Sequence, residues 1–181
     1  MKSNSLTFIT GSLDKVKLLD RYLGVPVRHR KLDLVEIQSL DLDTVVRAKA
    51  IEAYRQLGSP VLVEDTSLRF SALGRLPGPF VKWFLLELGT SGLCRLLDGY
   101  ENRSALAEVQ FAVYDGTAFR TFANAREGSI TSSPRGEHGF GWDPIFIPRG
   151  EKRTWGEMTA EEQKATSLRR PALEQLAQAL R

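Results

Sequence analysis

Hydrophobic and polar positions follow two different periods along this chain, one typical of strands and the other of helices. Residues 6–10 form an apolar run that predicts a short β-strand, and Gly11 follows it as a turn. Val16, Leu19 and Leu23 then recur at helical spacing with charged residues between them. The chain therefore opens with a strand, a turn and a helix.

Strands and helices continue to alternate along the chain. We expect an extended segment over residues 32–37, a helix from Asp43 that ends near Gly58, and a buried strand over residues 61–63. This order, followed by a hairpin, indicates an α/β fold with a mixed sheet. Further expected elements are a Gly/Pro-rich loop over 74–79, helices over 81–88 and 93–97, strands over 105–113 and 117–125 joined by Asp115-Gly116, a strand over 145–147 and a helix over 171–181.

Composition narrows the class of protein. Apolar residues make up 42% of the chain and charged residues 26%, the balance of a globular protein. Residues 1–181 contain no repeat and no long linker, so we expect one domain. No apolar run approaches the roughly 18 residues of a membrane span, and residues 1–5 lead into too short a run for a signal peptide. We therefore expect a cytoplasmic protein without a membrane partner.

The net charge and the cysteine content narrow the class of protein further. The net charge of +3 is small and dispersed, which suits a polyanionic small ligand and argues against nucleic acid as a partner. The only cysteine, Cys94, lies among leucines, so we expect a buried structural thiol.

The segment Thr10-Gly11-Ser12-Leu13-Asp14-Lys15 is the first candidate for chemistry. A strand-to-helix turn presents backbone N–H groups and the positive end of a helix dipole, and both favour a phosphate. Gly11 allows close approach, and Lys15 adds a positive charge one turn into the helix. The spacing is not that of the Walker loop. An ordinary turn with a solvated lysine remains the alternative.

Two adjacent acids, Glu64 and Asp65, follow the predicted buried strand. Carboxylates at the C-terminal edge of such a strand lie where α/β sheets bind ligands. Mg²⁺ prefers one or two carboxylates together with substrate phosphates. Glu36, at the end of another extended segment, is a candidate for a further carboxylate ligand. A solvated loop with a capping hydroxyl is the alternative.

Two segments rich in glycine are the remaining candidates. Residues 74–84 carry a rigid Pro-Gly-Pro loop that opens a helix, with Lys82 off the expected apolar face. Residues 139–144 place two aromatic rings between glycines, which suits a wall for a flat base, and Asp143 is an acceptor for ring N–H groups. Each segment also fits a structural role, as a rigid loop with a surface lysine and as a tight turn.

Together and in this order, these segments resemble the inosine triphosphate pyrophosphatase family, from Phe8 to Leu173. The resemblance implies an elongated mixed sheet with two lobes and a nucleotide cleft between them, a homodimer, and Mg²⁺ as cofactor. It also implies hydrolysis of dITP, ITP or XTP to the monophosphate and pyrophosphate, which cleanses the nucleotide pool. The matching stretches are Thr10-Gly11 with Lys15, residues 61–66, residues 76–84 and Phe140-Gly141-Trp142-Asp143-Pro144.

The resemblance also implies roles for single residues. Glu36 and Asp65 would hold the metal. Asp65 and Lys15 would be catalytic, with Asp65 accepting a proton from the attacking water and Glu64 assisting through water. The expected substrate-binding residues are Thr10, Gly11, Ser12, Lys15, Lys49, Thr66 and Lys82 around the triphosphate, Phe140, Gly141, Trp142 and Asp143 at the base, and Arg169.

This sequence departs from the family pattern at three positions. Ser12 stands where the family usually has Asn. Gln163 and Leu168 stand at a lysine and a histidine that contact the nucleotide in the family, whereas Arg169 keeps its place. Lys164 lies one position along, about 100° around a helix. Because leucine cannot hydrogen-bond, the base preference stays open.

Two alternative functions therefore remain. Gln163 and Leu168 favour a pyrophosphatase retuned to another modified nucleotide. A catalytically weak nucleotide-binding protein is the second alternative, although the retained acids and Lys15 argue against it.

Overall fold

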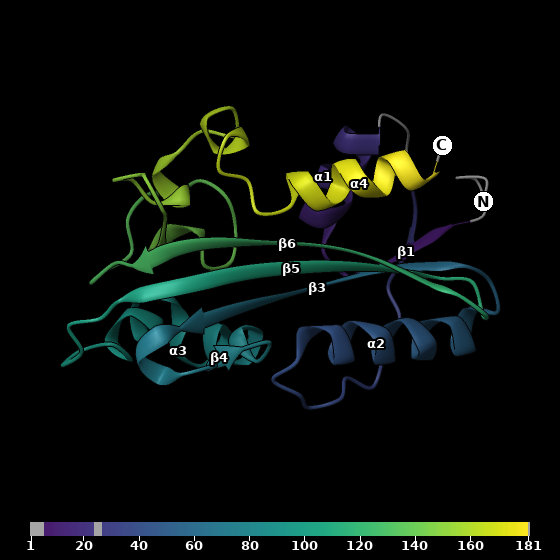
Figure 1. Cartoon of the computed structure of the whole chain (residues 1–181), viewed down its shortest axis with the longest axis horizontal. Helices are drawn as coiled ribbons and strands as arrows, with labels where there is room; N and C mark the ends of the chain where they lie inside the picture. Colours follow the sequence, from purple (N-terminus) through teal and green to yellow (C-terminus); the bar gives the residue numbers. More distant parts are fainter. Residues whose placement is uncertain (1–5, 24–26, 181) are drawn as a thin grey trace. The chain divides into compact units, whose positions relative to one another are not determined.

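A computed structural model of the chain describes residues 6–23 and 27–180 (Figure 1). The expectations for residues 1–5 and for Arg181, at the end of the terminal helix, lie outside the described residues. Within the described part of the chain, no helix combines the length and the apolar character needed to cross a membrane.

The described strands form one seven-stranded mixed sheet, which confirms the predicted α/β class. Its order is β2-β1-β3-β5-β6-β7, and β4 pairs with β3 off this path. β1 is parallel to β2 and β3, whereas β4 is antiparallel to β3 and β7 is antiparallel to β6. The strands are β1 (Thr7–Ile9), β2 (Arg28–Arg30), β3 (Val61–Phe70), β4 (Pro77–Gly78), β5 (Ser104–Tyr114), β6 (Phe119–Ile130) and β7 (Phe146–Pro148).

The chain divides into two compact units, and neither unit is continuous in sequence. Unit 1 comprises Met1–Asp65, Val109–Asn124 and Arg169–Arg181, and unit 2 comprises Thr66–Glu108 and Ala125–Leu168. The single domain and the nucleotide cleft between two lobes stay predictions.

In unit 1, helices cover both faces of the sheet (Figure 1). Helix α2 (Leu42–Leu57) lies on one face, and helices α1 (Leu13–Leu23) and α4 (Arg170–Leu180) pack together on the other. Val46 of α2 packs against β3 in a core of fully buried aliphatic side chains. Burial of one such valine contributes about 1.5–3 kcal/mol. Gly58 ends α2 in the left-handed conformation, with φ 69°, as its position predicts.

The second extended segment is the main error of the strand prediction. Residues 31–39 lie outside the strands, although Leu32 and Leu34 still pack against the core of unit 1. The strand beside β1 is instead β2, at Arg28–Arg30, and its three residues are all exposed. An edge strand with only charged and polar side chains has no apolar alternation, so the hydrophobic pattern could not reveal it.

Strand β3 is also longer than predicted. It runs for 10 residues to Phe70 instead of ending at residue 63. Polar residues interrupt the apolar run from Glu64 onward, yet most of them are buried. Ser67, for example, donates a hydrogen bond from Oγ to Glu108 Oε2 at 2.9 Å. These partners allow a strand to continue where composition alone indicates a loop.

Unit 2 contains helix α3 (Val81–Arg95), whose path is broken at Gly89, with φ 64° and ψ −179°. The break accounts for the two helices predicted over this segment. Cys94 is buried, as predicted. The Arg103 guanidinium donates to the carbonyl oxygens of Cys94 and Leu97 at the end of α3, at 2.8 and 3.1 Å. It also donates to two carbonyls at the end of β6 and thereby ties the helix to the sheet.

Candidate active site in unit 1

Strand β3 points Glu64 and Asp65 to opposite faces of the sheet, because successive side chains of a strand alternate. Asp65 contacts Lys49 of α2, and Glu64 contacts Lys15 of α1. The expectation that both acids lie beyond the end of the strand is therefore wrong. They lie inside the strand and belong to two separate charged clusters.

The first cluster is centred on the ammonium of Lys49. Lys49 Nζ lies 3.0 Å from Asp65 Oδ2 and 3.3 Å from Glu36 Oε1. It also donates a hydrogen bond to the backbone oxygen of Glu64 at 3.4 Å. Burial by itself lowers the pKa of Lys49, but the carboxylates of Asp65 and Glu36 outweigh burial, so the pKa is raised. Lys49 is therefore a fixed positive charge at neutral pH.

This cluster fits a divalent cation. Two carboxylates from separate segments, Glu36 and Asp65, already converge on one positive centre, the Lys49 ammonium. Among the described residues, no group of three or more His, Cys, Asp and Glu side chains is placed to hold a metal. A site with only two carboxylates leaves coordination positions for water and phosphate, which is how Mg²⁺ usually binds.

The second cluster lies on the other face of β3 and is centred on the Glu64 carboxylate. Glu64 Oε1 lies 3.2 Å from Lys15 Nζ and 3.0 Å from Arg169 Nε. Burial raises the pKa of Glu64, but the adjacent Arg169 and Lys15 outweigh burial, so the pKa falls below its ordinary value. Glu64 is therefore an anion that holds two cations. This ion pair with Arg169 was not expected, because no sequence pattern links residues so far apart.

The turn between β1 and α1 is closed by its own side chains. Thr10 Oγ1 accepts a hydrogen bond from the Ser12 N–H at 3.1 Å, and Ser12 Oγ accepts one from the Lys15 N–H at 3.4 Å. Ser12 thus acts as the cap of α1, a role that serine fills well. A Cβ on Gly11 would meet Lys31 at an ordinary contact distance of 3.4 Å, so steric crowding does not require glycine there.

The predicted base-binding segment forms a tight turn in unit 2. Asp143 Oδ2 accepts a hydrogen bond from the Phe140 N–H at 2.8 Å. Gly139, with φ +77°, approaches the same carboxylate so closely that a Cβ would lie 2.1 Å from Oδ2. Asp143 therefore has a structural role in shaping the turn that carries Phe140, Gly141 and Trp142. Its role toward a base stays a prediction.

The residues that replace the usual lysine and histidine also have structural partners. Gln163 Nε2 donates to the carbonyl oxygens of Trp155 and Met158, at 2.6 and 3.2 Å. Leu168 is 4% exposed and belongs to the buried core. Lys164, the candidate substitute, forms an ion pair with Glu161.

Two predicted triphosphate contacts, Thr66 and Lys82, belong to unit 2. Thr66 is a buried residue of β3. Lys82 Nζ lies 4.9 Å from the ring centroid of Trp83, a cation–π contact next to it in α3. The structure thus brings six side chains of unit 1 into two clusters. Those six are Glu36, Lys49 and Asp65 in one cluster, and Lys15, Glu64 and Arg169 in the other.

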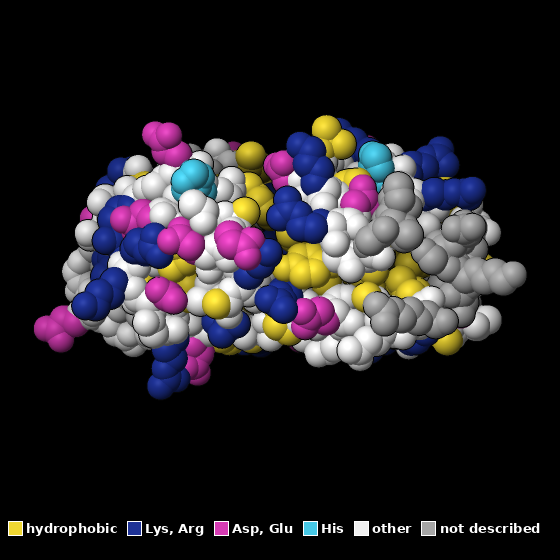
Figure 2. Space-filling model, turned by 90° about the horizontal axis from the view of Figure 1, so that it is seen from above, with side chains coloured by type: hydrophobic (Ala, Val, Ile, Leu, Met, Phe, Trp, Pro, Cys, Tyr) yellow, Lys and Arg dark blue, Asp and Glu magenta, His cyan; other side chains and the backbone are white. Residues whose placement is uncertain are grey.

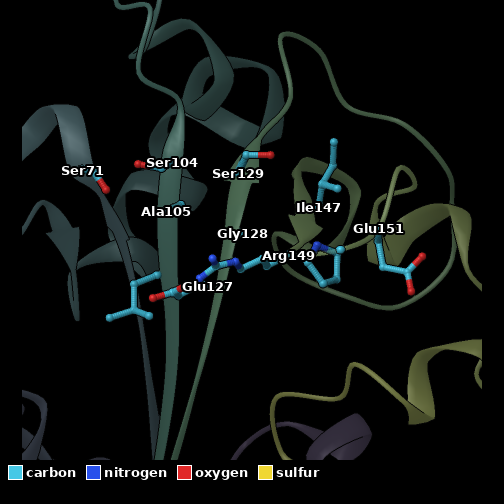
Figure 3. A pocket seen from close by; sticks show the side chains of 12 residues that line it. Ser71, Ser104, Ala105, Glu127, Gly128, Ser129, Ile147, Arg149 and Glu151 are labelled. Carbon is cyan, nitrogen blue, oxygen red and sulfur yellow. Dashed lines mark hydrogen bonds and ion pairs between the residues drawn. The ribbon is translucent and has the colours of Figure 1, made fainter.

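Unit 2 also contains an open hollow of about 600 Å³ beside β5 and β6 (Figure 3). The hydroxyl groups of Ser71, Ser104 and Ser129 and an ion pair between Glu127 and Arg149 lie around it. Both charged side chains of that pair are largely exposed. None of the residues expected to bind the nucleotide lines this hollow.

Charges of both signs are mixed on one face of the molecule (Figure 2). Figure 2 shows lysine and arginine side chains interleaved with acidic ones over the face in view. This mixture agrees with the small net charge of +3.

Comparison with known proteins identifies the family of this chain. The sequence model of the Ham1 family matches residues 6–179. The chain belongs to the Ham1 family. Inosine triphosphate pyrophosphatase 2 of Trypanosoma cruzi is 43% identical over 175 residues, which cover 94% of this chain and 89% of that protein. Inosine triphosphate pyrophosphatase of Yarrowia lipolytica is 42% identical over 177 residues, which cover 95% and 93%.

Solved structures of Ham1 proteins share the fold. A HAM1 protein from Coxiella burnetii matches with a TM-score of 0.85 and 26% identity, over 97% of both chains. A nucleoside-triphosphatase, also named dITP/XTP pyrophosphatase, from Mycobacterium abscessus matches with a TM-score of 0.78 and 28% identity, over 97% of this chain and 98% of that one.

Proposed function

We propose that this Ham1 protein is a Mg²⁺-dependent pyrophosphatase that hydrolyses ITP, dITP or XTP to the monophosphate and pyrophosphate. The observation that carries the proposal is the convergence of the Glu36 and Asp65 carboxylates on one point, now held by the Lys49 ammonium. The names of relatives 42–43% identical to this chain support the substrate class. The resulting role is removal of non-standard purine nucleotides from the cytoplasmic pool.

In this proposal, Glu36 and Asp65 would hold Mg²⁺. When bound, the metal would supply positive charge at the phosphates and make water more acidic. Asp65 accepts the proton from the water that attacks the α-phosphate. Lys49, whose ammonium lies between these two carboxylates, would contact the triphosphate.

Lys15 and the turn that precedes it bind the rest of the triphosphate. The ammonium of Lys15 lies beside the first turn of α1, where the helix dipole also favours an anion. Fixed cations are worth several kcal/mol where charge builds up on a leaving pyrophosphate. Arg169 completes the proposed substrate contacts of unit 1. Contacts of the substrate with Thr66 and Lys82 of unit 2 stay predictions, and a homodimer is the proposed assembly.

Release of pyrophosphate from a panel of nucleotides tests the proposal. With Mg²⁺, the protein should release pyrophosphate from ITP, dITP or XTP at least about tenfold faster than from ATP or GTP. A factor of ten corresponds to about 1.4 kcal/mol of discrimination. Equal rates for ATP and ITP would contradict the proposed substrate class.

A second candidate function is a pyrophosphatase for another modified nucleotide. The amide of Gln163 is used by two backbone carbonyls and Leu168 is buried, so neither position presents a side chain donor to a base. The same panel, extended to dUTP and other modified nucleotides, decides between the two. Fast release from one of those alone would favour this candidate.

A further inference from the structure

Glu64 is a buried carboxylate that the proposed chemistry does not use directly. Its side chain is 2% exposed and lies on the face of β3 opposite to Asp65. Burying a carboxylate is costly unless cations compensate it. A well-packed apolar residue is often at least as stabilising as a buried ion pair. The carboxylate is therefore better explained by its effect on its two partners than by stability.

Both partners of Glu64 are held by one oxygen atom. Oε1 lies 3.2 Å from Lys15 Nζ and 3.0 Å from Arg169 Nε. The two cations therefore lie no further apart than these contacts combined, about 6.2 Å. Like charges at that separation repel each other, and the carboxylate between them stabilises their approach. One carboxylate offsets one of the two positive charges, so the three groups together remain positive.

The ends of two helices thus meet at Glu64. Lys15 lies in the first turn of α1, and Arg169 directly precedes α4. The side chains of Lys15 and Arg169 are 20% and 11% exposed, so little of their surface is free to move in solvent. Cations fixed before the ligand arrives lose less conformational entropy when an anion binds.

We propose that Glu64 is a positioning residue for the triphosphate: it fixes Lys15 and Arg169 at the phosphate-binding end of α1. This inference rests on the proposed function, in which Lys15 contacts the triphosphate. The assistance to the attacking water that the resemblance implies for Glu64 stays a separate prediction. The positioning effect of Glu64 is on binding, through the two cations.

Glu64→Gln tests the proposal, because it keeps the size of the side chain and removes its charge. The probe is inorganic tripolyphosphate with Mg²⁺, and its Kd is measured by calorimetry. KM and kcat for ITP are measured in parallel. We expect Kd and KM to rise about tenfold or more, the effect of losing one or two charge-assisted contacts, and kcat to change less than about threefold.

Glu108→Gln is the matched control. Glu108 is also a largely buried carboxylate, 18% exposed, that holds an arginine, Arg69, and a hydroxyl, Ser67. It belongs to unit 2, and neither Arg69 nor Ser67 is a proposed substrate contact. We expect it to lower the Tm without changing the Kd for tripolyphosphate. A fall in Tm with unchanged or tighter tripolyphosphate binding in Glu64→Gln would overturn the positioning role.

Two further variants keep the test decisive if Glu64→Gln does not fold. Glu64→Asp keeps the charge but shortens the side chain by one methylene. Its Kd for tripolyphosphate should lie between that of the wild type and the tenfold higher Kd expected for Glu64→Gln. Combining Glu64→Asp with Lys15→Gln should cost less binding free energy than the sum of the two single losses, because both changes weaken the Lys15 contact. Additive losses would overturn the proposal. Absence of NTP hydrolysis by the wild type would refute the proposed function, while tripolyphosphate binding would still test Glu64.

Discussion

Replacing Lys49 by methionine tests the proposed cation site without changing the other charged cluster of unit 1. The ammonium of Lys49 lies between the Glu36 and Asp65 carboxylates, at 3.3 and 3.0 Å. Without it, two carboxylates no further apart than these contacts combined, about 6.3 Å, face each other across a partly buried space. Their repulsion is about 2–3 kcal/mol at an effective dielectric constant of 20, and water lowers it further.

The expected loss of stability in Lys49→Met is about 2–4 kcal/mol without divalent cations. It combines this repulsion with the loss of two ion pairs whose members are at most a third exposed. For a chain of 181 residues, this loss lowers the Tm by roughly 5–12 °C.

Magnesium should reverse most of this loss. A cation that binds only the folded state at 100 times its Kd stabilises it by about 2.7 kcal/mol. In the wild type, Mg²⁺ must first displace the Lys49 ammonium, whereas in Lys49→Met it relieves a repulsion. We therefore expect Mg²⁺ to raise the Tm of the variant by several degrees more than that of the wild type.

Thermal unfolding with and without Mg²⁺, at matched ionic strength, measures both effects. Arg55→Met is the control on the same helix, because Arg55 pairs with Glu52 and is 72% exposed. It should leave the Tm and its Mg²⁺ dependence nearly unchanged. An equal Mg²⁺ effect in Lys49→Met and in the wild type would refute the cation site.

Two further predictions concern stability. Arg103→Met removes a guanidinium that donates to four carbonyls at the ends of α3 and β6, so chemical denaturation should show a loss of about 3 kcal/mol; a loss under about 1 kcal/mol would contradict this bracing role. Because the folded-state pKa of Glu64 lies below its ordinary 4.5, its ion pairs stabilise the fold above that pH and are lost as the pH falls through the folded-state pKa. Denaturation from pH 6 to 3 should thus show a flatter acid decline for Glu64→Gln than for the wild type, and parallel declines would argue against it.

The helices and the central strands could be predicted because their apolar faces are buried in a regular pattern. Val46, Ala50 and Ala53 recur on one face of α2, and all three are fully buried. The hairpin turn at Asp115-Gly116 was found from local turn chemistry, and β5 and β6 flank it as expected.

The strand prediction failed where a strand is exposed and polar, or where it continues through polar residues that are buried. β2 lies at an edge with exposed charged side chains, so it carries no apolar signal. β3 continues through buried polar residues because Glu64 and Ser67 find partners from distant segments. Such partners depend on tertiary structure and leave no local pattern.

The sequence predicted which residues belong to the candidate site but not how they are arranged. The sequence pattern pointed to Lys15, Glu64 and Asp65, and the resemblance added Lys49 and Arg169. Neither the sequence pattern nor the resemblance revealed that β3 directs Glu64 and Asp65 to opposite faces of the sheet, because the predicted strand ended before both residues. Once the strand is known to continue, alternation alone places the two acids on opposite faces.

The most direct test of the proposed function compares pyrophosphate release from ITP by the wild type and by Asp65→Asn, with Mg²⁺ present. Asparagine keeps the shape of the side chain but neither accepts a proton nor supplies a charged metal ligand. We expect turnover to fall at least about a hundredfold, the usual contribution of a general base, while the protein stays folded. Wild-type turnover by a folded Asp65→Asn protein would contradict the account.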